Sequence, residues 1–149
     1  MKAAGAAALL LIAGCRGEAP QEPEGSSASV IIQSEDVVDG RRPELTLTCA
    51  DGFGSFWLAL GRTLEPGPAG AHGTIKVDDG APLRLALTWL GEERWAPRVG
   101  HDVETALVRA MVAGRNVYFS GPEGTTDRAY RWDLSRVGAG LEELRRRCG

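Results

Sequence analysis

The sequence predicts an α+β fold, with a mainly antiparallel, sandwich-like sheet and two short helices. Short runs of alternating apolar residues are separated by Asp-Gly pairs, which favour tight antiparallel hairpins. Two other segments repeat their apolar residues at the spacing of amphipathic helices. Strand pairs are separated by these helices without the regular βαβ order of a parallel sheet, and this order is typical of the α+β class.

The first two core strands are expected on either side of Asp51-Gly52, which forms the turn between them. In the first strand, ELTLTC, the two leucines and Cys49 share one face because side chains alternate along a strand. The second strand is FWLALG, and its expected core face consists of Phe56, Leu58 and Leu60.

A hairpin is expected within TIKVDDGAPLRLALTW, after a loop rich in glycine and proline at residues 62–73. Its turn is Asp79-Gly80, which lies between two alternating apolar runs. The segment that follows, HDVETALVRAMVAG, predicts a helix with Asp102 as its N-cap and Gly114 just past its end. The expected core face of this helix consists of Val103, Ala106, Leu107, Ala110 and Met111.

The end of the chain predicts a second hairpin and a second helix. In NVYFSGPEGTTDRAYRWDL, the core faces of the two strands pair Val117 and Phe119 with Tyr130, Trp132 and Leu134. The closing helix, GLEELRRRC, carries three arginines at its C-terminal end, where cations interact favourably with the helix dipole. The core-facing stripe of this helix consists of Val137, Leu141, Leu144 and Cys148.

The first 14 residues have the features of a secretory signal peptide. Lys2 supplies the positive charge, and the apolar run from Ala3 to Ile12 is too short to span a bilayer. The stretch IAGC that ends at Cys15 resembles the bacterial lipobox, in which an aliphatic residue and two small residues precede a lipidated cysteine. The resemblance implies cleavage before Cys15 and attachment there of acyl chains such as palmitate, which together anchor a protein stably on a membrane. The alternatives are an ordinary signal peptide with an incidental cysteine, or a buried apolar strand.

Residues 15–42 are expected to form the lipidated cysteine and a disordered acidic tether. The stretch RGEAPQEPEGSSAS is rich in Pro, Glu, Gly and Ser and has little to bury; a short strand at Val30 to Ile32 remains an alternative.

Residues 43–149 are expected to form a single globular α+β domain. The charge of this domain is close to balanced, with 13 Lys and Arg against 14 Asp and Glu. It shows no basic face with interleaved aromatic residues, which argues against nucleic acid as a partner.

With Cys15 assigned to the lipid, two cysteines remain in a compartment that permits disulfides. Cys49 and Cys148 both lie on core-facing stripes, so the sequence predicts a disulfide that joins the last helix to the first core strand. Closing so long a loop contributes up to about 4.7 kcal/mol in the chain-entropy model. Two free buried cysteines are the alternative. Metal binding is disfavoured, because neither cysteine has a second ligand at the usual spacing.

Residues 43–148 resemble the VasI-like family of type VI secretion accessory proteins. The resemblance is carried by PELTLTC, by the hairpin around KVDDGAPLRLALTW, by AMVAGRNVYFSG and by the closing WDLSRVGAGLEELRRRC. The family shares a cysteine that ends the first core strand, a cysteine at the chain terminus and a glycine-centred hairpin. This chain departs from the family in its N-terminal region, where SVIIQSEDVVDG lacks a tryptophan, and in carrying a lipobox. The resemblance implies a non-enzymatic accessory role in the cell envelope and no catalytic residues.

The sequence contains no constellation of residues that specifies a reaction, so we expect a protein that is not an enzyme and uses no cofactor or metal. His72 and His101 are the two histidines of the chain, and neither has a partner at metal-ligand spacing. The acid pairs at 78–79 and 92–93 are explained by a turn and by a solvated loop. The alternative function is a small secreted enzyme or metal-binding protein that uses the two histidines and nearby carboxylates.

Trp57, Tyr118 and Arg131 fall opposite the core faces of their strands. Tyrosine, tryptophan and arginine dominate interface hot spots, so these three residues are the candidate partner surface. The alternative is that the last helix covers this face. The sequence thus predicts a membrane-anchored lipoprotein that binds or scaffolds another envelope protein. The arginine that follows Cys15, in place of the aspartate that retains lipoproteins at the inner membrane of enteric bacteria, favours the periplasmic face of the outer membrane.

Overall fold

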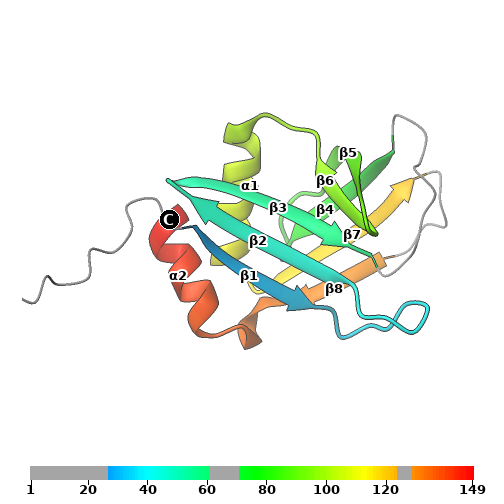
Figure 1. The fold of residues 1–149 in the computed structure, drawn as a ribbon, viewed down its shortest axis with the longest axis horizontal. Helices are drawn as coiled ribbons and strands as arrows, with labels where there is room; N and C mark the ends of the chain where they lie inside the picture. Colours follow the sequence, from blue (N-terminus) through cyan, green and yellow to red (C-terminus); the bar gives the residue numbers. More distant parts are fainter. Residues whose placement is uncertain (1–26, 61–70, 124–128) are drawn as a thin grey trace, which may run out of the picture.

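The structure, a computed structural model, describes residues 27–60, 71–123 and 129–149 (Figure 1). The predicted signal peptide, Cys15 and residues 16–26 of the expected tether lie outside the described residues. Those that are described form eight strands, two α-helices and one short 3-10 helix. In chain order these elements are β1 (Ala28–Gln33), β2 (Glu44–Ala50), β3 (Phe53–Ala59), β4 (His72–Val77), β5 (Leu83–Gly91), β6 (Arg94–Pro97), α1 (His101–Ala113), β7 (Asn116–Glu123), β8 (Ala129–Asp133), η1 (Leu134–Arg136) and α2 (Ala139–Cys148). Among these helices, none is long and apolar enough to cross a membrane.

The strands belong to one antiparallel sheet, in the order β1-β2-β3-β6-β5-β4-β7-β8. The predicted turn at residues 51–52 joins β2 to β3, and its Asp and Gly both have the positive φ that a tight hairpin requires (51° and 80°). β7 pairs with β8 as predicted, and the register places Val117 opposite Trp132 and Phe119 opposite Tyr130. The predicted fold class, α+β with a mainly antiparallel sheet, is therefore confirmed.

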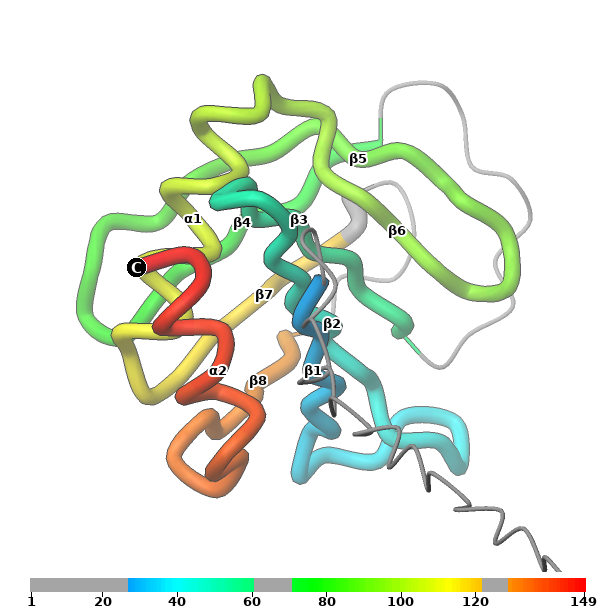
Figure 2. The backbone as a smooth tube through the Cα atoms, turned by 60° about the vertical axis from the view of Figure 1, so that its left-hand side comes forward, coloured from blue at the N-terminus to red at the C-terminus, as the bar shows by residue number. Residues whose placement is uncertain are grey.

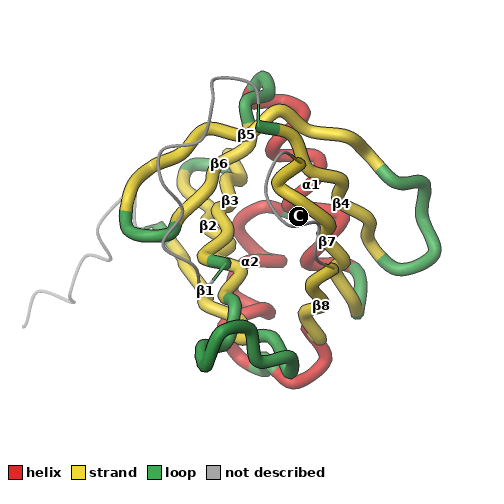
Figure 3. Tube along the Cα trace, turned by 90° about the vertical axis from the view of Figure 1, so that its right-hand side faces the viewer, coloured by secondary structure: helices red, strands yellow, loops and turns green. Residues whose placement is uncertain are grey.

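The sheet is strongly curved, so that its two edge strands, β1 and β8, approach each other. Figure 3 shows β1, β2 and β3 on one side and β4, β7 and β8 on the other, with the helices between them in this view. α1 packs on β3, whereas α2 packs on β1, β2 and α1 (Figure 2). The result is a nearly closed barrel whose concave side is filled in part by the two helices.

The core lies on the concave side, and the predicted strand faces are buried there. Phe56 and Leu58 of β3, and Leu60 just after it, are almost completely inaccessible, as predicted. The largest fully buried side chains are Trp95 of β6 and Trp132 of β8, from opposite parts of the sheet. Because strands distant in sequence contribute to the same core, the sheet and helices pack as one cooperative unit.

Cys49 in β2 and Cys148 in α2 form a disulfide, as predicted. Both cysteines are fully buried, and they are separated by 99 positions in the sequence. The end of α2 is also held on α1, because Arg109 donates a hydrogen bond to the carbonyl oxygen of Cys148. Arg145 donates in turn to the carbonyl oxygen of Val112 at 2.6 Å. The last helix is therefore secured at its C-terminal end by a covalent bond and by two charged hydrogen bonds.

The expected domain boundary at Pro43 is wrong, because the chain enters the sheet at Ala28. β1 pairs with β2 along its whole length, from Ala28 opposite Cys49 to Gln33 opposite Glu44. The alternative of a short edge strand in this region is thus the correct one. The physical reason is that β2 would otherwise leave its backbone unpaired on one side, and the Val-Ile-Ile run offers suitable pairing residues.

The segment between β1 and β2 is folded as well. Val38 is buried, with 6% of its surface exposed, and a β-bridge joins it to Arg41. Between them, Asp39 and Gly40 have φ of 50° and 79° and form a second Asp-Gly turn. Residues 28–42 therefore belong to the domain and not to the tether.

The buried face of α1 differs from the predicted one. Its N-cap is Gly100, not Asp102, and the buried residues are Thr105, Val108, Met111 and Val112. Of the predicted face, Val103, Ala106 and Ala110 are exposed. Polar contacts set this orientation, because the Thr105 hydroxyl accepts a hydrogen bond from the Gly54 N–H at 3.1 Å. A Glu104 carboxylate oxygen likewise accepts one from the Phe56 N–H at 3.1 Å.

The sequence also left β6 unassigned and placed residues 92–93 in a solvated loop. The two glutamates form the turn of the β5–β6 hairpin, and both have positive φ (50° and 67°). This conformation is uncommon for residues other than glycine. Glu93 pairs with Arg41 at 2.6 Å and Glu92 with Arg94 at 3.1 Å, so the turn is tied to the loop that follows β1.

Gly54 permits the close approach of α1 to β3, and replacing it should be costly. A Cβ atom at this position would lie 2.7 Å from the Cβ of Val108. We expect Gly54→Ala to lower the free energy of unfolding by about 1–3 kcal/mol, because the helix must shift. Denaturant titration followed by circular dichroism measures the change. The control is Gly100→Ala, where nothing lies within 4 Å of the added carbon and only the N-cap of α1 changes, at a cost of about 1 kcal/mol or less. A loss at Gly54 no larger than the loss at Gly100 would contradict the packing described.

Candidate functional site

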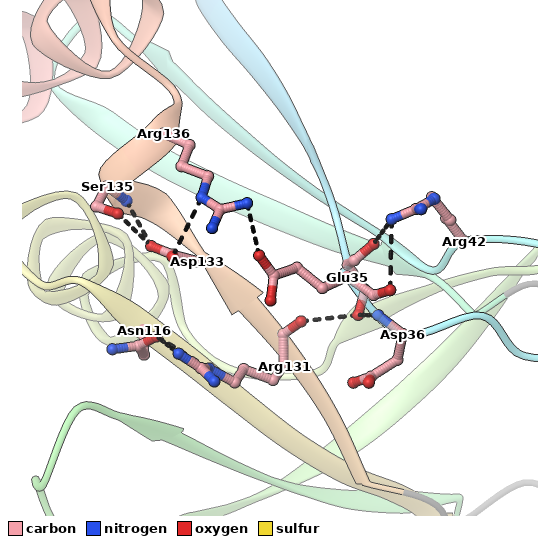
Figure 4. A network of polar contacts seen from close by, with 9 residues as sticks. Glu35, Asp36, Arg42, Asn116, Arg131, Asp133, Ser135 and Arg136 are labelled. Carbon is pink, nitrogen blue, oxygen red and sulfur yellow. Dashed lines mark hydrogen bonds and ion pairs between the residues drawn. The ribbon is translucent and has the colours of Figure 1, made fainter.

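The candidate site is a groove between the two edge strands, which we call the seam groove. β1 and its continuation to Glu35 lie on one side, and the end of β8 with residues 134–137 lies on the other. At one end of the seam, the Ser34 hydroxyl donates to the carbonyl oxygen of Arg131 at 2.8 Å (Figure 4). Beneath it, the indole N–H of Trp132 donates to the carbonyl oxygen of Pro43 at 3.2 Å. β1 and β8 are not paired with each other in the sheet, so side chains close the barrel here.

The seam groove has a volume of about 500 Å³. One wall is formed by residues 30–35, a run of consecutive positions from β1 and its continuation. Side chains of a strand alternate between its faces, so a consecutive run lines a groove when the edge of the strand faces it. The other wall includes Asp133, Arg136 and Val137.

The backbone groups of Ser29, Ile31 and Gln33 point toward the seam. In an antiparallel pair, every second residue directs both its N–H and its C=O to the partner strand, and the others direct them away. The Ser34 N–H donates to the Pro43 carbonyl at 2.8 Å, so Ser34 and every second residue before it face β2. Within the described part of the chain, no backbone hydrogen bond reaches the three seam-facing residues from β8 or α2.

A polar network spans the mouth of the seam groove. Arg136 pairs with Glu35 across the seam at 2.7 Å and lies 3.8 Å from Asp133 (Figure 4). Asp133 also accepts hydrogen bonds from the hydroxyl of Ser135 at 2.5 Å and from its backbone N–H at 2.9 Å. The hydroxyl bond, then the backbone bond and the nearby arginines Arg136 and Arg131, hold the pKa of Asp133 below its usual value. The carboxylate therefore stays charged down to acidic pH.

Arg42 lies where the seam groove meets a second hollow. Its guanidinium donates to the carbonyl oxygens of Ser34 and Glu35 at 3.1 and 3.4 Å, and it has no carboxylate partner among the described residues. The second hollow has a volume of about 540 Å³, and Gln33 and Arg42 line it as well. The positive charge of Arg42 is thus placed at the end of the seam groove without an ion-pair partner there.

The predicted partner surface is divided by the fold. Tyr118 and Arg131 are direct cross-strand neighbours on β7 and β8, and Lys76 lies over the Tyr118 ring, 5.1 Å from its centre. Arg131 is exposed, and its guanidinium donates to the side-chain oxygen of Asn116 at 3.0 and 3.1 Å. Trp57 lies on β3, from which β7 is separated by three strands in the sheet, so the structure does not bring it together with the other two.

The two histidines lie in regular elements. His72 is the first residue of β4, not part of the predicted loop, and His101 is the first residue of α1. No group of three His, Cys, Asp or Glu side chains suited to a metal ion occurs in the described residues. Asp78 accepts hydrogen bonds from the backbone N–H groups of Arg115 and Asn116, at 3.1 and 2.8 Å, so it fixes the start of β7.

Sequence reasoning missed the seam groove because it assigned residues 15–42 to a tether. Two signals in that stretch indicate the groove in retrospect. The run SVIIQ has the composition of a strand, and Asp39-Gly40 is a hairpin turn signal like the one recognised at Asp51-Gly52.

Compared with protein-family models, curated proteins and solved structures, the chain shows no significant match.

Proposed function

We propose that this protein is a lipid-anchored envelope protein whose folded domain binds another envelope protein. Cys15 carries the anchor, and residues 16–27 link it to β1. Even fully extended, a link of that length spans at most about 40 Å, which keeps the domain close to the membrane surface. The domain then serves as a binding module on the periplasmic side of the outer membrane.

The observation that carries this proposal is the order of parts along one chain. A segment resembling a lipobox is followed by a short link and then by a domain stapled through Cys49 and Cys148. Disulfides persist in oxidising compartments, and the bacterial envelope is one of them. The resemblance of the cysteine frame to the VasI-like family supports an accessory role in type VI secretion. The seam groove and the pair of half-buried Tyr118 and exposed Arg131 are the surfaces that a partner would contact.

The anchor is tested by Cys15→Ser. Without the acylated thiol, we expect the protein to move from the membrane fraction to the soluble fraction, since single weak contacts do not hold a protein on a bilayer. Cell fractionation with immunoblotting measures the distribution. Cys148→Ser is the matched control and should stay with the membrane, because it changes a different thiol. Full membrane retention of Cys15→Ser would rule out the lipoprotein assignment.

A further inference from the structure

Among the described residues, the edge of β1 that faces the seam forms no backbone hydrogen bonds with β8 or α2, which lie beside it, and its own residues lack the features that usually protect an edge strand. Natural sheets discourage pairing at their edges with charged residues, proline, bulges or a covering segment. The segment SASVIIQ at residues 27–33 has no charge and no proline, and it pairs with β2 without interruption. Ile31 has 60% of its surface exposed on this strand. An unprotected edge beside a groove is a place where another strand can add to the sheet.

We propose that the seam groove binds an extended peptide segment of the partner protein, which pairs with the open edge of β1. This deepens the proposed function by naming the class of partner, and it rests on the assignment of the domain as a binding module. The incoming segment would bond with the backbone groups of Ser29, Ile31 and Gln33. That edge is about 13 Å long, enough for a segment of four or five residues.

The groove has the volume for a short extended segment, and β8, which approaches β1 closely near Ser34, must move outward at that end as the segment enters. Its volume of about 500 Å³ lies within the range of roughly 300–1,000 Å³ found for ligand clefts. The Ser34–Arg131 hydrogen bond closes one end, so the segment is limited to the part of the seam before Ser34. The Glu35–Arg136 ion pair crosses the mouth, and its side chains are 54% and 75% exposed. Exposed pairs of this kind contribute little, so an incoming strand displaces it at small cost.

Charge complementarity indicates what the segment carries. Arg42 has no carboxylate partner among the described residues and lies at the Gln33 end of the groove. An aspartate, a glutamate or a terminal carboxylate of the peptide would meet it there. Toward the other end, the groove is lined by Val30, Ile31 and Val137, which favour apolar side chains. The partner segment is therefore extended and apolar, with an acidic group at one end.

Two other occupants fit the groove less well. A second copy of the domain carries the same wall of Asp133, Arg136 and Val137 beside its own β1, and that wall obstructs pairing of the two edges. Residues 16–26 of this chain contain Pro20 and Pro23, which remove backbone donors from a pairing strand.

The test uses the full chain, purified in detergent, and a library of random eight-residue peptides displayed on phage. We expect the selected peptides to combine alternating apolar residues with an acidic residue. A synthetic copy of one of them should slow amide hydrogen exchange at Ile31 and Gln33 by about tenfold or more. The backbone N–H groups of Val30 and Ile32 already donate to β2, so their exchange rates should change little.

Two substitutions at Ile31 distinguish the contribution of its backbone N–H to peptide binding from the contribution of its side chain. Ile31→Pro removes a seam-facing N–H that β2 does not use, and should weaken peptide binding by about tenfold or more. Ile31→Thr keeps the N–H and the β-branched shape and should bind within about threefold of the parent. If Ile31→Pro does not fold, amide exchange in the unaltered chain decides the question alone.

Four results would overturn the proposal. The selected peptide protects amides of β4 or β7 instead, or no peptide binds more tightly than millimolar. Alternatively, Ile31 and Gln33 are already protected without peptide, in a dimer by a second copy or in a monomer by residues 16–26. None of these readouts depends on membrane attachment, so they are independent of the Cys15→Ser experiment.

Discussion

A chain that begins at Pro43 is expected not to fold cooperatively, whereas a chain that begins at Ser27 should retain the stability of the whole domain. Removing β1 exposes one backbone edge of β2 and the apolar face beneath it. It also deletes the buried side chains of Ile32 and Val38, each of which contributes about 1.5–3 kcal/mol. Together with the lost pairing, this approaches the total stability of about 5–15 kcal/mol expected for a small domain.

The measurement is thermal and denaturant unfolding of the two truncated chains. A paired substitution gives a graded version, because neighbouring residues of β1 face opposite sides of the sheet. Ile32→Ala, at a buried position, should cost about 2–5 kcal/mol. Ile31→Ala, at an exposed position, should cost about 0.5 kcal/mol or less. A stable, cooperatively unfolding chain from Pro43 would show that β1 is dispensable and would restore the boundary expected from composition.

Reduction of the Cys49–Cys148 disulfide is expected to lower the free energy of unfolding by a few kcal/mol. The bond closes a loop across 99 positions, for which the chain-entropy model gives up to about 4.7 kcal/mol. The measured loss should be smaller, because reduced chains retain some structure in the unfolded state. Urea titration with and without reductant measures the difference.

Two variants separate the effect of this bond from the effect of thiols in general. Cys148→Ser should match the reduced protein, and reductant should then have no further effect on its stability. Cys15→Ser should unfold at the same urea concentration as the parent, because the disulfide joins Cys49 to Cys148 and does not involve Cys15. Alkylation of both Cys49 and Cys148 in the native protein without reductant would show that the disulfide does not form.

The sequence predicted those parts of the fold that depend on local pattern. The Asp51-Gly52 turn, the pairing of β7 with β8 and the buried stripe of α2 follow from residue alternation, helical spacing and turn chemistry. The disulfide followed from the count of cysteines and their place on core-facing stripes. The turn, the hairpin and the helix stripe are each determined by residues that lie close together in the chain. The disulfide was predicted because only two cysteines remained once Cys15 was assigned to the lipid.

Features that depend on the packing of elements distant in sequence could not be predicted from local pattern. α1 buries the apolar stripe of Val108, Met111 and Val112. The contacts of Glu104 and Thr105 with the backbone of β3 favour this stripe over the predicted one. Trp57 is separated from Tyr118 because strand order places β3 and β7 apart in a sheet whose neighbours are not consecutive in sequence.

The sequence by itself determined the α+β class, the paired cysteines and most strand faces, because these reflect local periodicity. Only the tertiary structure decided that residues 28–42 belong to the domain, since a short edge strand between two polar segments is stabilised by pairing with its partner, which lies elsewhere in the sequence. The seam groove likewise exists only because the curved sheet brings β1 and β8 together without pairing them. Sheet curvature arises from the twist of all the strands in concert, and no single segment of the sequence encodes it.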